Sequence, residues 1–139
     1  MSSGARSDKA AQTYSEPGAL LWTDLTTRDP AKAMKFFAVL MDWDIRELDQ
    51  GPGQYWQIYI DGVGEGGIMP MPEMVPPQVP AYWLDYFATE DVAVSVAKAR
   101  SLGAVVTVEP TKVGEMLTFA VLDDPGGATF ALLQPIGPS

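Results

Sequence analysis

The sequence predicts an α+β fold in which two βαβββ modules in tandem form a curved mixed sheet with a concave cleft. The first observation is an internal repeat, because residues 22–29 match residues 84–91 at an offset of 62. Both copies are strand-like runs that lead into an aspartate suited to cap a helix, Asp29 or Asp91. The second observation is that three strand-like runs follow each predicted helix. One helix covers only one face of a sheet, so each module leaves its other face open.

Composition limits both the size of the fold and its partners. A chain of 139 residues corresponds to one domain, at roughly 150 residues per domain. Apolar residues make up 47% of it, enough for a core, and the formal charge of −9 argues against nucleic acid or anionic membranes as partners. The sequence has no cysteine and no histidine. Disulfides, thiolate zinc sites and Ser-His or Cys-His catalysis are therefore excluded.

We expect a single domain between two short tails. The N-terminal residues 1–16 are polar and without periodicity, which is typical of a disordered arm, and they lack the apolar core of a signal peptide. No apolar run approaches the roughly 20 residues of a membrane span, so we expect a cytoplasmic protein. The remaining segments are module one at 17–70, a linker at 70–80, module two at 81–135, which completes a domain at 17–135, and a tail at 136–139.

The first module begins with a strand over 20–27, where apolar and β-branched residues dominate. Asp29 and Pro30 then provide a helix cap and a residue suited to the first helical position. Five apolar residues at helical spacing predict the buried face of that helix. They are Ala33, Phe36, Phe37, Leu40 and Met41. The three strands expected after the helix cover residues 43–48, 54–60 and 66–69.

The segment from Met69 to Pro80 holds five prolines and three methionines, a density of proline that no helix or central strand tolerates. We interpret it as an extended linker between the modules. Its methionines either line a binding pocket or pin the linker to the surface, and the sequence leaves both open.

The second module repeats the plan. A strand over 81–89 leads to Asp91, and Gly103 is suited to end the helix in the left-handed conformation. The face predicted to pack is made of Val92, Val96, Ala99 and Leu102. The strands expected after the helix cover 104–109, 115–122 and 128–134.

Four segments give the chain a resemblance to a known superfamily. They are Leu25-Thr-Thr-Arg-Asp29, Gly66-Gly-Ile-Met-Pro-Met-Pro72, Tyr86-Phe-Ala-Thr-Glu-Asp91 and Asp124-Pro-Gly-Gly-Ala-Thr-Phe130. Over 17–135 the pattern resembles the vicinal oxygen chelate superfamily, which includes glyoxalases, bleomycin-resistance proteins and extradiol dioxygenases. The second of the four segments is similar to the glyoxalase-like "hydroxylase" subgroup. The resemblance implies the tandem fold but does not specify an activity, because one fold hosts many functions.

The resemblance also implies where metal ligands would stand. Members that use a metal carry one ligand on the first strand and one on the fourth strand of each module. The matching positions here are Trp22 and Leu84, seven residues before each helix-capping aspartate, then Ala131 and its repeat mate Met69. None of these side chains ligates a hard or borderline divalent ion, apart from weak binding by the methionine thioether. We therefore predict no metal and no cofactor, and we expect neither glyoxalase I nor extradiol dioxygenase activity.

Strand alternation selects the residues of the expected cleft, since side chains that share parity with Trp22 and Leu84 face it. The ligand-binding candidates are Trp22, Asp24, Tyr59, Met69, Met71 and Tyr86. In the strand over 54–60 the set containing Tyr55, Gln57 and Tyr59 alternates with the set containing Trp56, Ile58 and Ile60. The second set looks like core, but the sequence does not decide which set lines the cleft.

Three of these candidates have an alternative role. Trp22 either stacks on a planar ligand or fills the core. Asp24 is either a general base or partner of a cation on an apolar face, or a carboxylate at a water-exposed rim. Tyr86 either donates a hydrogen bond to a ligand or is a satisfied core tyrosine.

Two functions fit these residues. One is a binder without metal that sequesters a small neutral or cationic, aromatic molecule, as the resemblance to bleomycin-resistance proteins implies. The other is a metal-independent isomerase or lyase, with Asp24 as general base and Tyr86 as acid or oxyanion partner. Whether the protein is an enzyme stays open, as does a third reading in which the cleft has filled in. We also expect a homodimer, as the resemblance implies.

Overall fold

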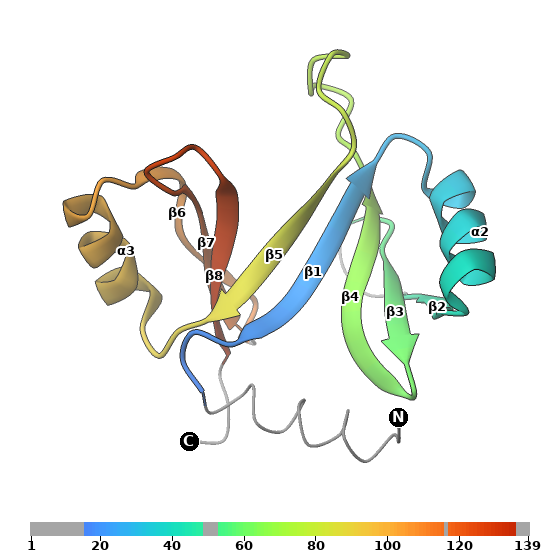
Figure 1. The fold of residues 1–139 in the computed structure, drawn as a ribbon, viewed down its shortest axis with the longest axis horizontal. Coiled ribbons are helices and arrows are strands. Elements are labelled where there is room, and N and C mark those ends of the chain that lie inside the picture. The colour runs from blue at the N-terminus through green and yellow to red at the C-terminus, as the bar shows by residue number, and fades with distance from the viewer. Residues whose placement is uncertain (1–15, 49–52, 116, 136–139) are drawn as a thin grey trace. The chain divides into compact units, whose positions relative to one another are not determined.

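The computed structural model describes residues 16–48, 53–115 and 117–135. It is a mixed α+β structure of eight strands and two helices (Figure 1). The first module holds β1 (Leu20–Thr27), α2 (Pro30–Met41), β2 (Asp44–Glu47), β3 (Trp56–Ile60) and β4 (Val63–Pro70). The second holds β5 (Tyr82–Ala88), α3 (Val92–Ser101), β6 (Val105–Val113), β7 (Leu117–Asp123) and β8 (Thr129–Pro135). The predicted βαβββ order is confirmed in both modules. Of the expected arm, residues 1–15 lie outside the described residues, as does the tail at 136–139.

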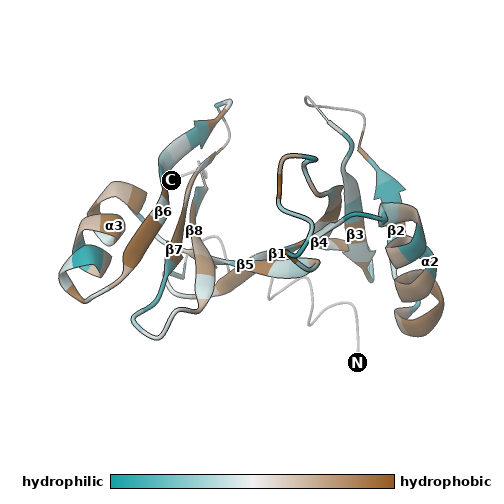
Figure 2. Ribbon diagram, turned by 90° about the horizontal axis from the view of Figure 1, so that it is seen from above, coloured by the Kyte–Doolittle hydropathy of each residue, from teal (hydrophilic) through white to brown (hydrophobic). Residues whose placement is uncertain are grey.

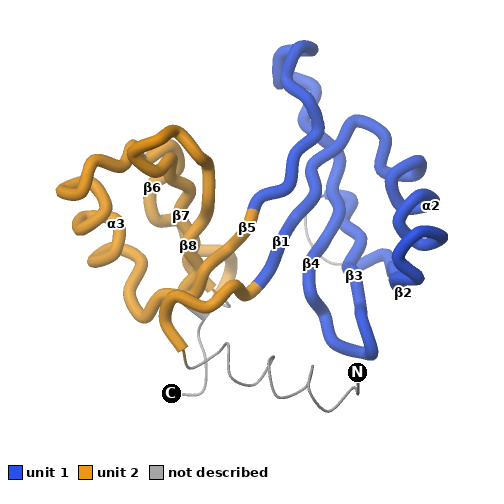
Figure 3. The backbone as a smooth tube through the Cα atoms, viewed as in Figure 1, with its two compact units in different colours: residues 1–7, 22–84 blue, residues 8–21, 85–139 orange. Residues whose placement is uncertain are grey.

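Both modules connect their strands in the same way. The order is β2-β3-β4-β1 in the first and β5-β8-β7-β6 in the second, so the first strand of each module lies beside the fourth. That pair is parallel in each case, and the other neighbours are antiparallel. The chain divides into two compact units, with residues 22–84 in one and residues from 85 onward in the other (Figure 3). Identical connectivity in both modules is the structural counterpart of the sequence repeat.

The core of the first module lies between its sheet and α2. Leu25, Ile58 and Ile68 are 5%, 2% and 0% exposed, and they come from β1, β3 and β4. Leu25 and Ile68 are register partners in the parallel pair, so their side chains share a face. Ala33, Met34 and Phe37 of the helix, together with Trp43 and Trp56, pack against this cluster. The helix therefore covers one face of the sheet and leaves the other to the site.

Helix α2 begins as the sequence predicts but buries a different face. Asp29 accepts a hydrogen bond of 3.0 Å from the amide of Lys32, which caps the helix, and Pro30 occupies its first turn. Phe36 and Leu40 were expected in the buried face, yet they are 57% and 61% exposed. The contact instead runs through Ala33, Met34 and Phe37, so the helix is rotated relative to the expectation. Figure 2 shows hydrophobic colouring over much of α2.

The second module packs its sheet against α3. Its core consists of Val92, Val96, Ala120 and Leu122, each at most 2% exposed. Asp91 caps the helix by accepting from the amide of Val94, the counterpart of the Asp29 cap. The prediction that Leu102 belongs to the packed face is wrong, because this residue follows the last helical turn and is 67% exposed. Among the described residues, neither helix has the length and hydrophobicity that crossing a membrane requires.

The register of the strands corrects the repeat offset. Asp24 lies opposite Gly67 in the first module, and Tyr86, which is 62 residues after Asp24, lies opposite Ala131 in the second. The fourth strands are therefore offset by 64, and the structural mate of Ala131 is Gly67. The expectation that this mate is Met69 is wrong, because the second module has two more residues between its helix cap and its last strand.

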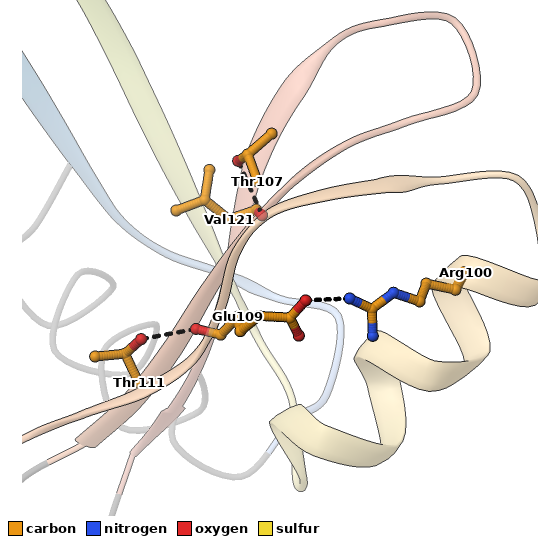
Figure 4. Close-up of polar contacts among 5 residues, drawn as sticks. All are labelled: Arg100, Thr107, Glu109, Thr111 and Val121. Atoms are coloured by element: carbon orange, nitrogen blue, oxygen red, sulfur yellow. Dashed lines mark hydrogen bonds and ion pairs between the residues drawn. The ribbon is translucent and has the colours of Figure 1, made fainter.

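Strand β6 extends beyond its predicted end at Glu109. A proline would interrupt a central strand, because it has no amide hydrogen to donate. Pro110 is tolerated because β6 is the edge strand of its module and its register with β7 shifts between Val108 and Thr111. Figure 4 shows the polar contacts that hold this edge. Thr107 donates to the carbonyl of Val121 at 3.1 Å, and Arg100 on α3 forms an ion pair with Glu109.

Candidate functional site

The face of the first module that α2 does not cover carries the candidate site, and we call it the open face. Ile58 of β3 is buried in the core beneath α2, so alternation directs Tyr55, Gln57 and Tyr59 to the open face. The structure therefore selects this set of side chains for the open face, a choice that the sequence left open. The open face holds Trp22, Asp24, Tyr55, Gln57, Tyr59 and Met69.

Three polar atoms meet on the open face. The hydroxyl of Tyr55 donates a hydrogen bond of 2.6 Å to Oδ1 of Asp24. The indole Nε1 of Trp22 lies 2.9 Å from the same Oδ1 and 2.9 Å from the Tyr55 hydroxyl. Trp22 and Asp24 are two apart on β1, whereas Tyr55 lies 31 residues from Asp24 and immediately precedes β3. We call these three residues the open-face triad.

Asp24 does not lie at a water-exposed rim, which was one of the two roles expected for it. Its residue is 7% exposed, and Thr26 on the same strand is 5% exposed. A buried carboxylate is costly unless hydrogen bonds replace the water it loses. The two donors of the triad provide such bonds, and the described residues include no buried side-chain nitrogen or oxygen without a partner.

Glycines of β4 lie beneath the triad. A side chain at position 67 would overlap the hydroxyl and ring carbons of Tyr55, so the phenol ring occupies the space directly above Gly67. A side chain at position 64 would lie 3.5 Å from the Trp22 ring and 2.9 Å from the amide nitrogen of Gln57. The aromatic rings therefore rest close to the backbone of β4.

Tyr59 lies toward the edge of this sheet. The guanidinium carbon of Arg46 is 4.7 Å from the centre of the Tyr59 ring, a cation–π distance. Asp44, opposite Tyr59 on β2, forms a 2.6 Å ion pair with Arg46. The side-chain hydrogen bond that Arg46 donates to Asp44, followed by the negative charge of Asp44, raises the pKa of Arg46. Tyr59 is thus half-buried beneath a permanent cation at the exposed end of the face.

The two methionine candidates differ in their environment. Met69 pairs with Thr26 across the parallel strands, which places it on the open face, and it is half-buried. Met71 lies just beyond β4, is 7% exposed, and donates its amide hydrogen to the carbonyl of Thr27 at 2.9 Å. The exposed methionine of the linker is Met74, at 88%.

Tyr86 belongs to the second module, where the corresponding face is more apolar. It is half-buried and lies opposite Ala131, which is fully buried at 0% exposure. Val121 pairs with Ala131 on the other side, and Leu133 follows on the same face two residues on. Leu84, two residues before Tyr86, is half-buried. The second module therefore has no counterpart of the open-face triad among these positions.

Comparison with known proteins identifies the family. Residues 21–133 match the family model described as a glyoxalase-like domain. The chain belongs to this glyoxalase-like family. Its fold is that of the vicinal oxygen chelate superfamily, as the four sequence segments predicted. A methylmalonyl-CoA epimerase from Streptomyces coelicolor has the same fold, with a TM-score of 0.66 at 14% identity, over 88% of this chain and 100% of that one. The hypothetical protein BH1468 from Bacillus halodurans gives a TM-score of 0.69 at 8% identity, over 89% and 99%.

Two curated relatives share sequence with this glyoxalase-like domain. The "Putative glyoxylase CFP32" of Mycobacterium tuberculosis is 34% identical over 125 residues, which are 90% of this chain and 47% of the relative. The anthracycline biosynthesis protein DnrV of Streptomyces peucetius is 30% identical over 128 residues, 84% of this chain and 46% of the relative. The chain spans about half the length of the curated relatives it matches.

The residues of this glyoxalase-like domain do not fit the divalent metal that the superfamily implies. Trp22 and Leu84 hold the first-strand places, and Gly67 and Ala131 hold the fourth-strand places by register. None offers a hard or borderline donor, and the space above Gly67 is filled by a phenol ring. Among the described residues, no three histidine, cysteine, aspartate or glutamate side chains converge as a metal site.

Sequence reasoning missed Tyr55 as a site residue. It was named only as one member of a strand set, while Tyr59 was chosen from that set. The signal available was the pair Gly66-Gly67 inside a predicted strand, because glycine within a strand often marks a close approach by another group. Identifying Tyr55 as that group requires the register of β3 and β4, which the sequence does not supply.

Proposed function

We propose that this glyoxalase-like domain binds a small, flat, neutral or cationic molecule on the open face of its first module, without a metal ion. The observation that supports this most directly is the open-face triad, in which a buried carboxylate and an indole are fixed by a phenol. Half-buried aromatic rings offer stacking surfaces, and a fixed carboxylate offers an acceptor that disfavours anions. Met69 adds a polarizable side chain to the same face.

The name of one relative supports a planar ligand. DnrV carries anthracycline biosynthesis in its name, and anthracyclines are flat polycyclic molecules. A domain that presents Trp22 and Tyr55 on one face is suited to molecules of that shape. Because this chain spans about half of each curated relative, the activity of those whole proteins is not carried over to it.

The test compares three flat fluorescent dyes of different charge: proflavine as a cation, 7-methoxycoumarin as a neutral molecule and resorufin as an anion. A binder is stabilised by its ligand, with a rise in melting temperature that follows the logarithm of dye concentration above Kd. We expect stabilisation by proflavine or 7-methoxycoumarin and none by resorufin. In Asp24→Asn the proflavine effect weakens while the 7-methoxycoumarin effect persists. No shift with any dye up to millimolar concentration would contradict the proposal.

A second candidate is a metal-independent isomerase or lyase that uses Asp24 as general base. The burial of Asp24 favours it, because a desolvated carboxylate is a typical catalytic group. Against it, Oδ1 of Asp24 already accepts hydrogen bonds from Trp22 and Tyr55, which leaves it less available to take a proton from a substrate.

The enzyme alternative has its own test. Methylmalonyl-CoA, named with the epimerase that shares the fold, is incubated with the protein in D₂O, and deuterium entry at its α-carbon is followed by mass spectrometry. Exchange that is lost in Asp24→Asn would favour the enzyme, and no exchange favours the binder for this substrate class. The expected homodimer remains a prediction, which sedimentation velocity can check.

A further inference from the structure

Glycine at two positions of β4 is required by space and not by backbone conformation. A β-carbon at position 66 would overlap the backbone carbonyl of Thr23, and a β-carbon at position 67 would overlap the ring of Tyr55. The described glycines with positive φ are Gly18, Gly62, Gly103, Gly114 and Gly127, so Gly66 and Gly67 have backbones that any residue can adopt. Glycine inside a strand weakens it, because it adds chain entropy and offers no side chain to pack. The compensating feature at Gly67 is the ring of Tyr55, which occupies the volume that a β-carbon would fill.

The position of Tyr55 explains how the buried carboxylate of Asp24 obtains a hydrogen-bond donor. Asp24 is 7% exposed, and the phenol of Tyr55 reaches its carboxylate from the residue before β3, a strand that is not adjacent to β1 in the sheet. The ring must cross β4 to do so, and Gly67 lies directly opposite Asp24 on β4. A glycine at the crossing point therefore lets Tyr55, which precedes β3, donate to the carboxylate of Asp24 on β1 at 2.6 Å.

We propose that Tyr55 is the positioning residue of the open face and that Gly67 is its seat. Tyr55 holds the Asp24 carboxylate and the Trp22 indole in one fixed arrangement, so that a flat aromatic ligand meets a preorganised surface. This inference rests on the proposed function, since it assigns to Tyr55 a part in ligand binding. A positioning residue acts through its neighbours, so its loss must change Trp22 as well as affinity.

The first experiment tests positioning and needs no ligand. The indole N–H signal of Trp22 is assigned in a ¹⁵N–¹H spectrum by its absence in Trp22→Phe. We expect this signal to move in Tyr55→Phe and in Gly67→Ala. It stays in place in Tyr82→Phe, a matched removal of an exposed hydroxyl, and in Gly53→Ala, where a β-carbon meets nothing within 4 Å. An unmoved Trp22 signal in both test variants would overturn the positioning role.

The second experiment measures dye binding in the same four variants, with the cation proflavine and the neutral 7-methoxycoumarin as probes. We expect Kd for the dye that binds the wild type to rise roughly tenfold in Tyr55→Phe and in Gly67→Ala, and to stay within about twofold in the two controls. If Gly67→Ala fails to fold, Tyr55→Phe carries the test alone, because it removes one hydroxyl and keeps the ring.

The two proposals fail in different ways. If the wild type binds a dye and Tyr55→Phe binds it equally well, the role of Tyr55 is overturned while the proposed function stands. If the wild type binds neither dye, the proposed function is wrong and so is the part of Tyr55 in binding. The Trp22 signal in Tyr55→Phe then reports only whether Tyr55 fixes the position of Trp22 in the folded protein.

Discussion

The hydroxyl of Tyr55 donates a 2.6 Å hydrogen bond to Oδ1 of Asp24, which links β1 to the residue before β3, a strand that is not adjacent to β1. The contact is possible because Gly67, on the strand between them, has no side chain. The glycine in β4 thus leaves room for the contact that fixes the buried carboxylate of Asp24 and the half-buried indole of Trp22. The strength of the Tyr55–Asp24 hydrogen bond can be measured as a free energy.

The pair should show strong energetic coupling in a double-mutant cycle. We expect Tyr55→Phe, Asp24→Ala and the double variant to give a coupling free energy of about 1.5–3 kcal/mol, as for hydrogen bonds to charged groups. Urea unfolding of the four proteins provides the measurement. The pair Asp24 and Tyr82 serves as control, with coupling below about 0.5 kcal/mol. Equal coupling in both cycles would mean that the Tyr55 contact contributes nothing specific.

Gly67→Ala should be among the more damaging single substitutions in the first module. The added methyl group overlaps the Tyr55 ring, so the ring must leave its seat and Asp24 loses a donor. Overpacking and a lost buried hydrogen bond together predict a loss of about 2–4 kcal/mol in the free energy of unfolding. Gly53→Ala, which meets open space, should change it by less than about 1 kcal/mol. A Gly67→Ala protein as stable as wild type would show that the ring is not confined there.

The order of elements could be predicted from the sequence, because local signals specified each element and the repeat related the two modules. Asp29 and Asp91 are residues that favour helix N-caps, and each accepts a hydrogen bond from an amide in the first turn of its helix. The rotation of α2 was not predictable, since Phe36 and Leu40 are as apolar as the residues that do pack. Which apolar stripe faces a sheet depends on how the helix docks.

The site was predicted in part. Strand parity placed Trp22, Asp24 and Met69 on one face, and the register of β1 and β4 agrees. Tyr55 could not be chosen over Tyr59, because the choice depends on which of the two rings lies over Gly67, opposite Asp24. The second module is also two residues longer between its helix cap and its last strand, so Ala131 corresponds to Gly67 and not to Met69. A comparison of the two halves at one constant offset cannot detect this difference.

The two helix caps should be worth similar amounts. Asp29→Ala and Asp91→Ala each remove an acceptor for an amide in the first turn, at 3.0 and 3.2 Å. We expect each to lower the free energy of unfolding by about 1 kcal/mol, as N-cap replacements do. Glu73→Ala, at an exposed position outside the helices, should change it by less than about 0.5 kcal/mol. A cap variant indistinguishable from Glu73→Ala in thermal or urea unfolding would contradict the equivalence of the modules.

Arg28 should control access to the proline-rich linker. Its guanidinium donates to the carbonyl of Val79 at 2.5 Å and to that of Pro76 at 2.8 Å, which ties the linker to the end of β1. Arg28→Ala releases both carbonyls, so a protease should cut the linker near Met74 several times faster at low enzyme concentration. Lys35→Ala, which removes an exposed cation from α2, serves as control. Equal cleavage rates would show that the tie does not restrain the linker.

Divalent metals should neither stabilise nor occupy the purified protein. Each place where the superfamily carries a ligand is taken by a carbon side chain, an indole or no side chain, and the phenol of Tyr55 fills the space above Gly67. A metal that binds the native state, present at a concentration a hundred times its Kd, would add about 2.7 kcal/mol to the free energy of unfolding and raise the melting temperature by several degrees. We expect NiCl₂, ZnCl₂ and MnCl₂ at submillimolar concentration to leave the melting temperature within about 1 °C of that in EDTA. Elemental analysis after dialysis is the second readout, because stoichiometric nickel, zinc, iron or manganese retained against buffer would contradict the ligand assignment even without a thermal shift.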